Sequence, residues 1–251
     1  MSGISWNLIR HLVARDFRIR YSGSVLGVVW SVLIPMAQLG VLVFTFGSVV
    51  PVNIDDYPAF VYSALLPWTW FSACLGSTGS LFFSHRDLVR RPNFQPIILT
   101  VVNTLSNLVT FLLSLPLLFL LLAWYQRSVA ASLVALPALL VLQAVMTVGL
   151  SLLVSTWNVF YRDVSQLVNI VLSLLFFLTP IFYRPVVESK YAMIFQFNPL
   201  AVLISSYRNI LFEGRLPEWD AWAHITAVSA ALLVCGYLVY RHELPDVVDT
   251  V

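Results

Sequence analysis

The sequence predicts an all-α polytopic membrane protein with six transmembrane helices, an N-terminal amphipathic helix at the membrane interface and short re-entrant helices on the outer side. Hydrophobic residues make up 59% and charged residues only 10% of the 251 residues, with a mean hydropathy of +0.86. An average soluble domain is about 25% charged. The few charges are also clustered, so that they separate long apolar stretches. These observations exclude an ordinary soluble globular protein and fit a single membrane domain over residues 1–251.

Six uncharged stretches reach the roughly 20 residues that a helix needs to cross a bilayer. They run Tyr21–Ile54, Tyr57–Ser84, Pro92–Gln126, Ser128–Tyr161, Val164–Tyr183 and Ala221–Tyr240. Each is predicted to hold one helix of ordinary length with flanks at the membrane surface. A seventh stretch, Tyr191–Tyr207, is shorter and is interrupted by Asn198 and Pro199. This interruption favours short re-entrant or surface helices.

Residues 1–22 are predicted to form an amphipathic helix in the cytoplasmic headgroup layer, with arginines toward anionic lipid. On a helical wheel, the apolar half holds Trp6, Leu8, Ile9, Leu12, Val13, Phe17 and Ile19, and the polar half holds Asn7, Arg10, His11, Arg15 and Arg18. Asp16 and Arg20 intrude on the apolar half. A simple positive flank of the first span is the alternative. Because the segment has charges and no apolar core, we expect no cleavable signal peptide.

The distribution of positive charge predicts that both termini are cytoplasmic. With the N-terminus inside, the inner segments hold Arg10, Arg15, Arg18, Arg20, Arg86, Arg90, Arg91, Arg162 and Arg241. The outer segments hold Arg127, Arg184, Lys190, Arg208 and Arg215. This excess on one side follows the positive-inside rule, and an even number of spans agrees with it.

Residues that would power transport or catalyse a reaction within the membrane are missing from the sequence. The single lysine, Lys190, lies in an outer loop without the glycines of a phosphate-binding loop. We therefore expect no ATP hydrolysis and no cofactor bound by this chain. The spans lack the ionisable residues of ion-coupled carriers, and the four histidines are too scattered for a metal site. We expect no catalytic residues, and the net charge of +2 gives no basis for nucleic-acid binding.

The polar side chains at membrane depth are uncharged, and they include Gln38, Asn103, Asn107, Gln143 and Asn169. Hydrogen bonding between helices is the expected role, and lining of a polar path is the alternative. Energy for any transport must then come from a partner that acts on the cytoplasmic segments.

Two cytoplasmic segments are candidates for contact with such a partner. The loop 84–96 surrounds apolar residues with charges, as expected of a short helix that lies across a partner's groove. Its candidate contact residues are His85, Arg86, Asp87, Leu88, Arg90 and Arg91. A loop whose arginines only set topology is the alternative. In the short turn Tyr161–Asp163, we expect Arg162 and Asp163 to cap helix ends or to pair locally.

Aromatic residues gather in the first, second and fifth spans. Those that we consider as channel lining are Trp30, Tyr62, Trp68, Trp70, Phe71, Phe176 and Phe177. Such rings commonly anchor helices at the membrane surface, but Trp68 and Trp70 lie well inside their uncharged stretch. Flat aromatic faces offer weakly specific surfaces for sugar rings. The channel-lining interpretation therefore stands beside lipid-facing and packing roles.

Several motifs in the chain resemble the transmembrane permease of type-2 ABC exporters, in the branch that exports polysaccharide and O-antigen. The motifs are RDFRIRY at 15–21, LGVVW at 26–30, LLPWTWF at 65–71, DLVRR at 87–91, NVFYRDV at 158–164, FLTPIFY at 177–183 and NPL at 198–200. Each motif is weak alone, whereas their order and spacing together are specific. The resemblance covers nearly the whole chain.

The resemblance implies a homodimer joined to two copies of a separate ATPase, which binds ATP and Mg²⁺. It also implies export of a lipid-linked or reducing-end-modified glycan across the cytoplasmic (inner) membrane. In the family, the N-terminal helix and the first cytoplasmic loop contact the ATPase, which here means Arg15, Arg18, Arg20 and the loop 84–96. Short helices within 184–220 would form an outer gate, with Asn198, Pro199 and Tyr207. After the paired arginines the chain reads PNFQP at 92–96, which departs from the family's usual Phe, Pro and basic residue and leaves the end of the coupling segment undefined.

Other functions remain open at this point. A permease of the same architecture that exports a teichoic-acid-type polymer, a lipid or a drug would share these features. A membrane-embedded enzyme of glycan or lipid synthesis would need clustered carboxylates and histidines in its loops, which the sequence lacks. A plain membrane anchor would have little reason to keep a long outer loop of short, broken helices.

Overall fold

The computed structural model describes residues 6–50, 52–92, 94–185, 195 and 197–250. Over these residues the chain is helical and has no strand. The elements are α1 Trp6–Tyr21, η1 Gly27–Val29, α2 Trp30–Phe44, the π-helical turn η2 Thr45–Val49, α3 Tyr57–Thr78, α4 Leu81–Ser84, α5 Arg86–Val89, α6 Ile97–Trp124, η3 Ser132–Ala135, α7 Leu136–Phe160, α8 Val164–Leu178, α10 Pro199–Leu211 and α11 Trp219–Thr250. The predicted all-α polytopic membrane fold is confirmed.

Five helical segments in the described part of the chain are long and apolar enough to cross a membrane, and α8 is a shorter apolar helix. The five are Gly27–Val49, Tyr57–Thr78, Ile97–Trp124, Ser132–Phe160 and Trp219–Val248. Together with α8 they fall within or overlap the six uncharged stretches of the sequence. The predicted fifth span, Val164–Tyr183, therefore forms a helix only as far as Leu178. Pro180 explains this end, since the residue before a proline disfavours helical geometry.

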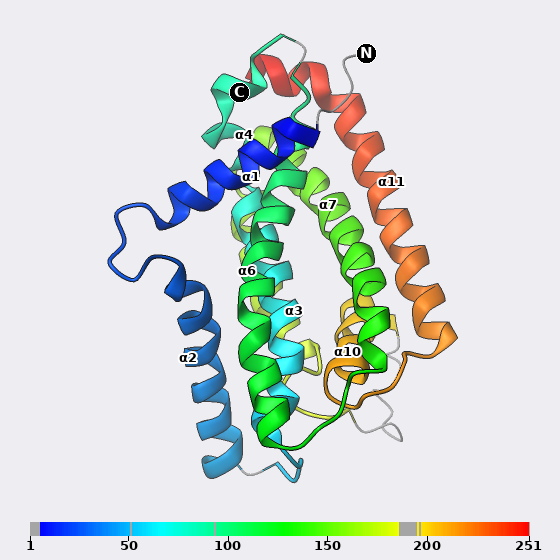
Figure 1. Ribbon diagram of the computed structural model, residues 1–251. Coiled ribbons are helices and arrows are strands. Elements are labelled where there is room, and N and C mark those ends of the chain that lie inside the picture. The colour runs from blue at the N-terminus through cyan, green and yellow to red at the C-terminus, as the bar shows by residue number, and fades with distance from the viewer. Residues whose placement is uncertain (1–5, 51, 93, 186–194, 196, 251) are drawn as a thin grey trace.

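Helix α3 forms the centre of the bundle. Of its most apolar part, 78% is buried, against 17% for the first and last spans. It packs against α2, α6, α7, α8 and α10, and its side chains from Phe60 to Leu66 are almost entirely shielded from solvent. The first span has few neighbours within the chain (Figure 1). The central helix α3 is thus far more buried than the peripheral first span, although its mean hydropathy is lower, at 1.2 against 2.0.

Helices α7 and α11 approach each other closely at two glycines. A Cβ atom on Gly149 would lie 2.5 Å from the backbone of Leu232, and one on Gly236 would lie 2.2 Å from the carbonyl oxygen of Gly149. Glycine is therefore required at both positions, because only its missing side chain permits this approach.

The polar residues at membrane depth divide into two groups. Asn103 donates to the carbonyl of Cys74 at 3.0 Å, and Gln143 donates to the carbonyl of Pro67 at 2.9 Å. These bonds join α6 and α7 to α3, which confirms the predicted bonding between helices for these two residues. Gln38 and Asn169 instead line cavities.

Charged residues gather at the two ends of the bundle. Helices α1 and α4 lie at one end with the last turns of α11, and α10 lies toward the other end (Figure 1). At the α10 end, Arg127 pairs with Asp56 at 2.7 Å across two loops, and its guanidinium lies 4.6 Å from the Phe212 ring. Arg127, one of the arginines predicted to lie on the outer side, is thus held at the α10 end of the bundle.

Candidate functional site

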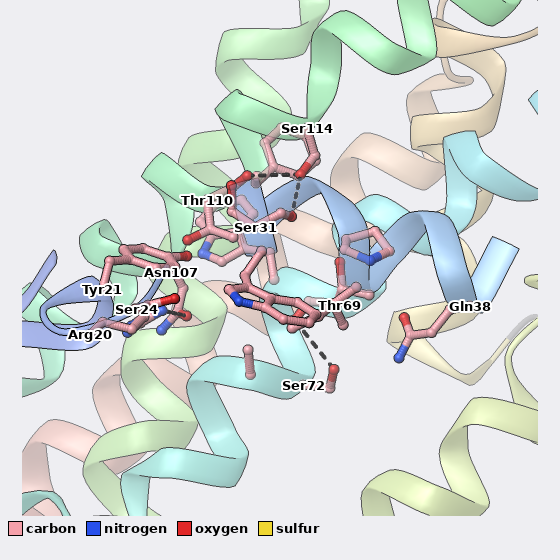
Figure 2. A pocket seen from close by; sticks show the side chains of 16 residues that line it. Arg20, Tyr21, Ser24, Ser31, Gln38, Thr69, Ser72, Asn107, Thr110 and Ser114 are labelled. Atoms are coloured by element: carbon pink, nitrogen blue, oxygen red, sulfur yellow. Dashed lines mark hydrogen bonds between the residues drawn. The ribbon is translucent and has the colours of Figure 1, made fainter. Parts of the chain in front are cut away.

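Two cavities flank α2. The first lies between the end of α1, α2, α3 and α6 and has a volume of about 530 Å³. Figure 2 shows its polar side chains converging from these helices. Its lining consists of Arg20, Tyr21, Ser24, Trp30, Ser31, Ile34, Pro35, Gln38, Thr69, Trp70, Ser72, Ala73, Asn107, Thr110, Phe111 and Ser114. Hydroxyl and amide groups therefore face the indole rings of two tryptophans.

The second cavity lies on the other flank of α2, against α3 and α8, and has a volume of about 580 Å³. Its lining consists of Ala37, Gln38, Val41, Leu42, Leu65, Trp68, Thr69, Ser72, Ser173, Phe176 and Phe177. Gln38, Thr69 and Ser72 line both cavities, so the two are contiguous. We call them together the α2 groove. Among its lining residues only Arg20 carries a charge.

A more polar cavity of about 400 Å³ lies at the α4 end of the same α3–α8 pair. It is lined by Gly76, Ser80, Phe83, Asn158, Arg162, Ser165 and Asn169. With the α2 groove it forms two stripes of small or polar residues at helical spacing. The stripes are Thr69, Ser72, Gly76 and Ser80 on α3 and the turn after it, and Ser165, Asn169 and Ser173 on α8. These stripes were not predicted from the sequence, although residues spaced three to four apart lie on the same face of a helix.

The structure separates the aromatic residues that were considered as channel lining. Trp30 and Trp70 line the first cavity of the α2 groove, and Trp68, Phe176 and Phe177 line the second. The rings of Trp68 and Phe176 lie 5.7 Å apart across the α3–α8 contact. Tyr62 and Phe71 line neither cavity, because α3 directs them into the packed core with at most 2% exposure. The second and fifth spans thus bring three of the predicted aromatics together.

The N-terminal helix and the loop 84–96 lie against each other. Ile9 and Leu12 of α1 pack on Ile98 of α6, and Leu88 and Phe94 from the loop join the same apolar cluster. The loop forms the short helix α5, as expected. Arg15, Arg18, Arg86, Asp87, Arg90 and Arg91 remain exposed. They surround this cluster with charge that other parts of the chain do not cover.

Three of the predicted contact residues also make contacts within the chain. Arg20 donates to Oδ1 of Asn107 at 2.7 Å and pairs with Asp16 at 3.3 Å. Its guanidinium therefore borders the α2 groove, as Figure 2 shows. His85 Nδ1 lies 3.1 Å from the carbonyl of Leu81, and Leu88 is half-buried. These three side chains support the local structure in addition to any contact with a partner.

At the opposite end, α10 closes over the bundle. Asn198 caps the helix by accepting from the backbone of Leu200 at 3.0 Å, and Pro199 occupies its first turn. Tyr207 is fully buried, with its ring 6.2 Å from that of Phe111. Part of the predicted gate region, residues 186–194 and 196, lies outside the described residues. The three predicted gate residues thus start α10 and fix its buried face.

A family model described as "ABC-2 type transporter" matches residues 7–212. The chain belongs to the ABC-2 type transporter family. The match includes α1, the α2 groove and α10 and therefore covers all parts of the candidate site.

Relatives of this ABC-2 transporter chain match it over almost its whole length. The O-antigen export system permease protein RfbA of Myxococcus xanthus is 32% identical over 97% of this chain and 95% of that protein. The protein of the same name from Klebsiella pneumoniae is 29% identical over 95% of this chain and 93% of its own length. The polysialic acid transport protein KpsM of Escherichia coli is 21% identical over 93% and 92%.

The chemistry available to the ABC-2 subunit is that of a permease. Over the part of the chain that the structure describes, no three His, Cys, Asp or Glu residues lie close enough to hold a metal ion. The α2 groove offers hydrogen bonds from neutral groups and flat aromatic faces. Aromatic faces and neutral hydrogen-bonding groups are suited to weak contacts with polar, uncharged rings.

Proposed function

We propose that this chain is the permease subunit of an ATP-driven exporter that moves O-antigen or a similar lipid-linked polysaccharide across the cytoplasmic membrane. The observation that carries the proposal is the α2 groove, where neutral polar side chains and aromatic rings line two contiguous cavities. The similarity of the chain, over nearly its full length, to proteins named for O-antigen export supports the choice of substrate.

The lining suits a polymer that must slide. A chain of sugars presents hydroxyl groups and flat ring faces, which match hydroxyl, amide and aromatic partners. Because many weak contacts of similar strength follow one another, no single position holds the polymer firmly. A deep, charged site would instead slow every step. The groove has only Arg20 as a charged residue, at its end near α1.

The energy would come from a separate ATPase that binds ATP and Mg²⁺, docked on the exposed arginines of α1 and the loop 84–96. This placement puts both termini in the cytoplasm, in agreement with the positive-inside rule. Leu88 and Phe94 pack with α1 in one cluster, so a push on the loop also moves α1. Through Arg20 and Asn107, that movement reaches the wall of the α2 groove.

We further propose that a second copy of this chain covers the exposed side of α2 and α8. Leu172 is the only buried residue of α8. Leu167, Ile170, Val171, Leu174, Phe177 and Leu178 are exposed apolar residues on it. Because the α2 groove opens between α2 and α8, a partner copy on this side would convert an open groove into an enclosed path. Lipid on this side would leave polar groups of the groove facing hydrocarbon, which is unfavourable.

The proposal is tested in cells that lack the gene. We expect lipid-linked glycan to accumulate on the cytoplasmic side and to be exported again when the native chain is supplied. The Gln38→Leu variant should restore export poorly, because it removes a polar group common to both cavities. If the deletion strain exports glycan normally but loses resistance to a drug, the drug would replace glycan as the proposed substrate. If it exports glycan normally but no longer exports a lipid, that lipid would replace glycan.

A further inference from the structure

The last residues of the predicted fifth span form no helix. Helix α8 has 15 residues, which gives a length of about 22 Å, whereas the hydrocarbon core is about 30 Å thick. The segment Thr179–Tyr183 must provide most of the remaining distance. Non-helical backbone is tolerated at this depth only where other protein groups satisfy its carbonyls.

Every carbonyl from Leu178 to Phe182 has a donor. Arg208 of α10 donates to the carbonyls of Pro180 and Ile181 at 2.7 and 2.9 Å. The Tyr57 hydroxyl of α3 donates to that of Phe182 at 2.9 Å. The two remaining carbonyls have a weaker and a local partner. The side-chain amide of Asn198 donates to the Leu178 carbonyl at 3.5 Å, and the backbone amide of Ile181 donates to the Thr179 carbonyl at 2.7 Å. One guanidinium therefore satisfies two of the five carbonyls.

The guanidinium itself is held firmly in place. Arg208 is only 5% exposed, and its Cζ lies 3.8 Å from the centre of the Phe60 ring on α3. The guanidinium of an arginine stays charged at neutral pH even when it is buried. A buried cation is costly unless it is paired. Here two carbonyl dipoles and an aromatic face take the place of a carboxylate.

We infer that Arg208 is a positioning residue that fastens the non-helical end of the fifth span to α10, so that these two segments move as one unit. Since Phe176 and Phe177, one turn before this end, line the α2 groove, α10 would then set the outer part of the groove. The inference rests on the proposed transport function only for its export readout.

The test uses the full-length permease with its ATPase in lipid nanodiscs and measures backbone hydrogen exchange in Arg208→Gln. We expect exchange at Thr179, Ile181, Phe182 and along α10 to rise about tenfold or more, as expected for loss of a charge-assisted hydrogen bond. Exchange in α7 and α11 should not change. In cells, the rate of glycan export by Arg208→Gln should fall by at least the same factor as hydrogen exchange rises, while the complex still hydrolyses ATP.

Two further variants separate a positioning role from general support of the fold. Arg208→Lys keeps the charge and reaches fewer carbonyls, so it should show the same pattern with a smaller amplitude. Tyr57→Phe loosens the same segment without touching α10, so faster exchange should be confined to Phe182 and Tyr183. The Tyr57→Phe control therefore separates the effect of losing the contact between the segment and α10 from the effect of losing any one hydrogen bond to the segment.

Unchanged exchange over 179–182 in Arg208→Gln would overturn the inference. An equal rise in α7 and α11 would also overturn it, because Arg208 would then act as ordinary support for the fold. If Arg208→Gln does not assemble, the Arg208→Lys pattern decides in the same way. If the native chain exports no glycan but the expected exchange pattern appears, the proposed function fails and the fastening role stands.

Discussion

Arg20 of α1 donates a hydrogen bond to Oδ1 of Asn107 of α6 over 2.7 Å and thereby joins the interface helix to the polar interior of the bundle. Asn107 in turn donates to Asn103 at 3.0 Å, and Asn103 donates to the carbonyl of Cys74 at 3.0 Å. Thr78, one turn further along α3, donates to Ser151 of α7 at 3.1 Å. Hydrogen bonds in a medium of low dielectric are costly to break, so we expect movement of α1 to reach α6 and α3.

Replacement of Arg20 should uncouple ATP hydrolysis from transport. In Arg20→Ala we expect the ATPase to bind and to hydrolyse ATP, while export per ATP falls about tenfold, because a hydrogen bond from a charged donor contributes about 1.5–3 kcal/mol. Asn7→Ala is the matched control, since Asn7 is an exposed polar residue of the same helix and is not one of the arginines on which the ATPase would dock. Equal export per ATP in the two variants would argue against transmission through Arg20.

Reversal of charge at Arg90 and Arg91 should prevent binding of the ATPase. Both side chains are exposed, next to the cluster that α1 forms with the loop 84–96. The Arg90→Glu, Arg91→Glu double variant should fold normally and lose the ATPase during co-purification. Arg241→Glu changes an exposed arginine on α11 instead and should retain it. A double variant that still binds the ATPase would place the docking surface elsewhere.

A change at Gln38 should impair transport and leave stability intact. The side chain is exposed and lines both cavities of the α2 groove. For Gln38→Leu we expect several-fold slower export, with a melting temperature close to that of the native chain, because no buried bond is lost. Met36→Ala, also on an exposed part of α2 but outside both cavities, is the control. Similar export by both variants would remove Gln38 from the path.

Substitution at the contact of α7 with α11 should destabilise the fold. Gly149→Ala and Gly236→Ala each place a Cβ against backbone at 2.5 Å or less, and such overpacking costs about 1–3 kcal/mol. Gly76→Ala meets its nearest atom at an ordinary 3.5 Å and should melt like the native chain. Thermal unfolding in detergent compares the three variants, and equal melting temperatures would contradict the close approach.

The positions of the charges were sufficient to predict where the long apolar helices lie, because a charged residue rarely lies within a bilayer. They did not predict where helix α8 ends. Pro180 signals a break, but only the folded chain shows that Arg208 and Tyr57 satisfy the carbonyls beyond it. Arg208 was counted as one of several outer cations, and no local pattern distinguishes a buried arginine from an exposed one.

The candidate site was predictable in part for a similar reason. Trp68 and Phe176 were considered as channel lining because they are aromatic, and in the structure their rings lie 5.7 Å apart. Tyr62, with the same chemistry, lies in the core because its position on α3 faces other helices. Arg20 was expected to contact a cytoplasmic partner, and its hydrogen bond to Asn107 was not predicted. The direction of a side chain depends on tertiary packing, which composition and spacing do not specify.

The central claim is that this chain forms the path along which a partner ATPase exports a lipid-linked glycan. Its most direct test uses inverted membrane vesicles that contain the chain, the ATPase and radiolabelled lipid-linked glycan, and follows protection of the glycan from an added glycosidase. We predict that ATP makes the glycan resistant, and that this protection is lost in Arg20→Ala although ATP is still hydrolysed. ATP hydrolysis by the native complex without any protection of the glycan would contradict the claim.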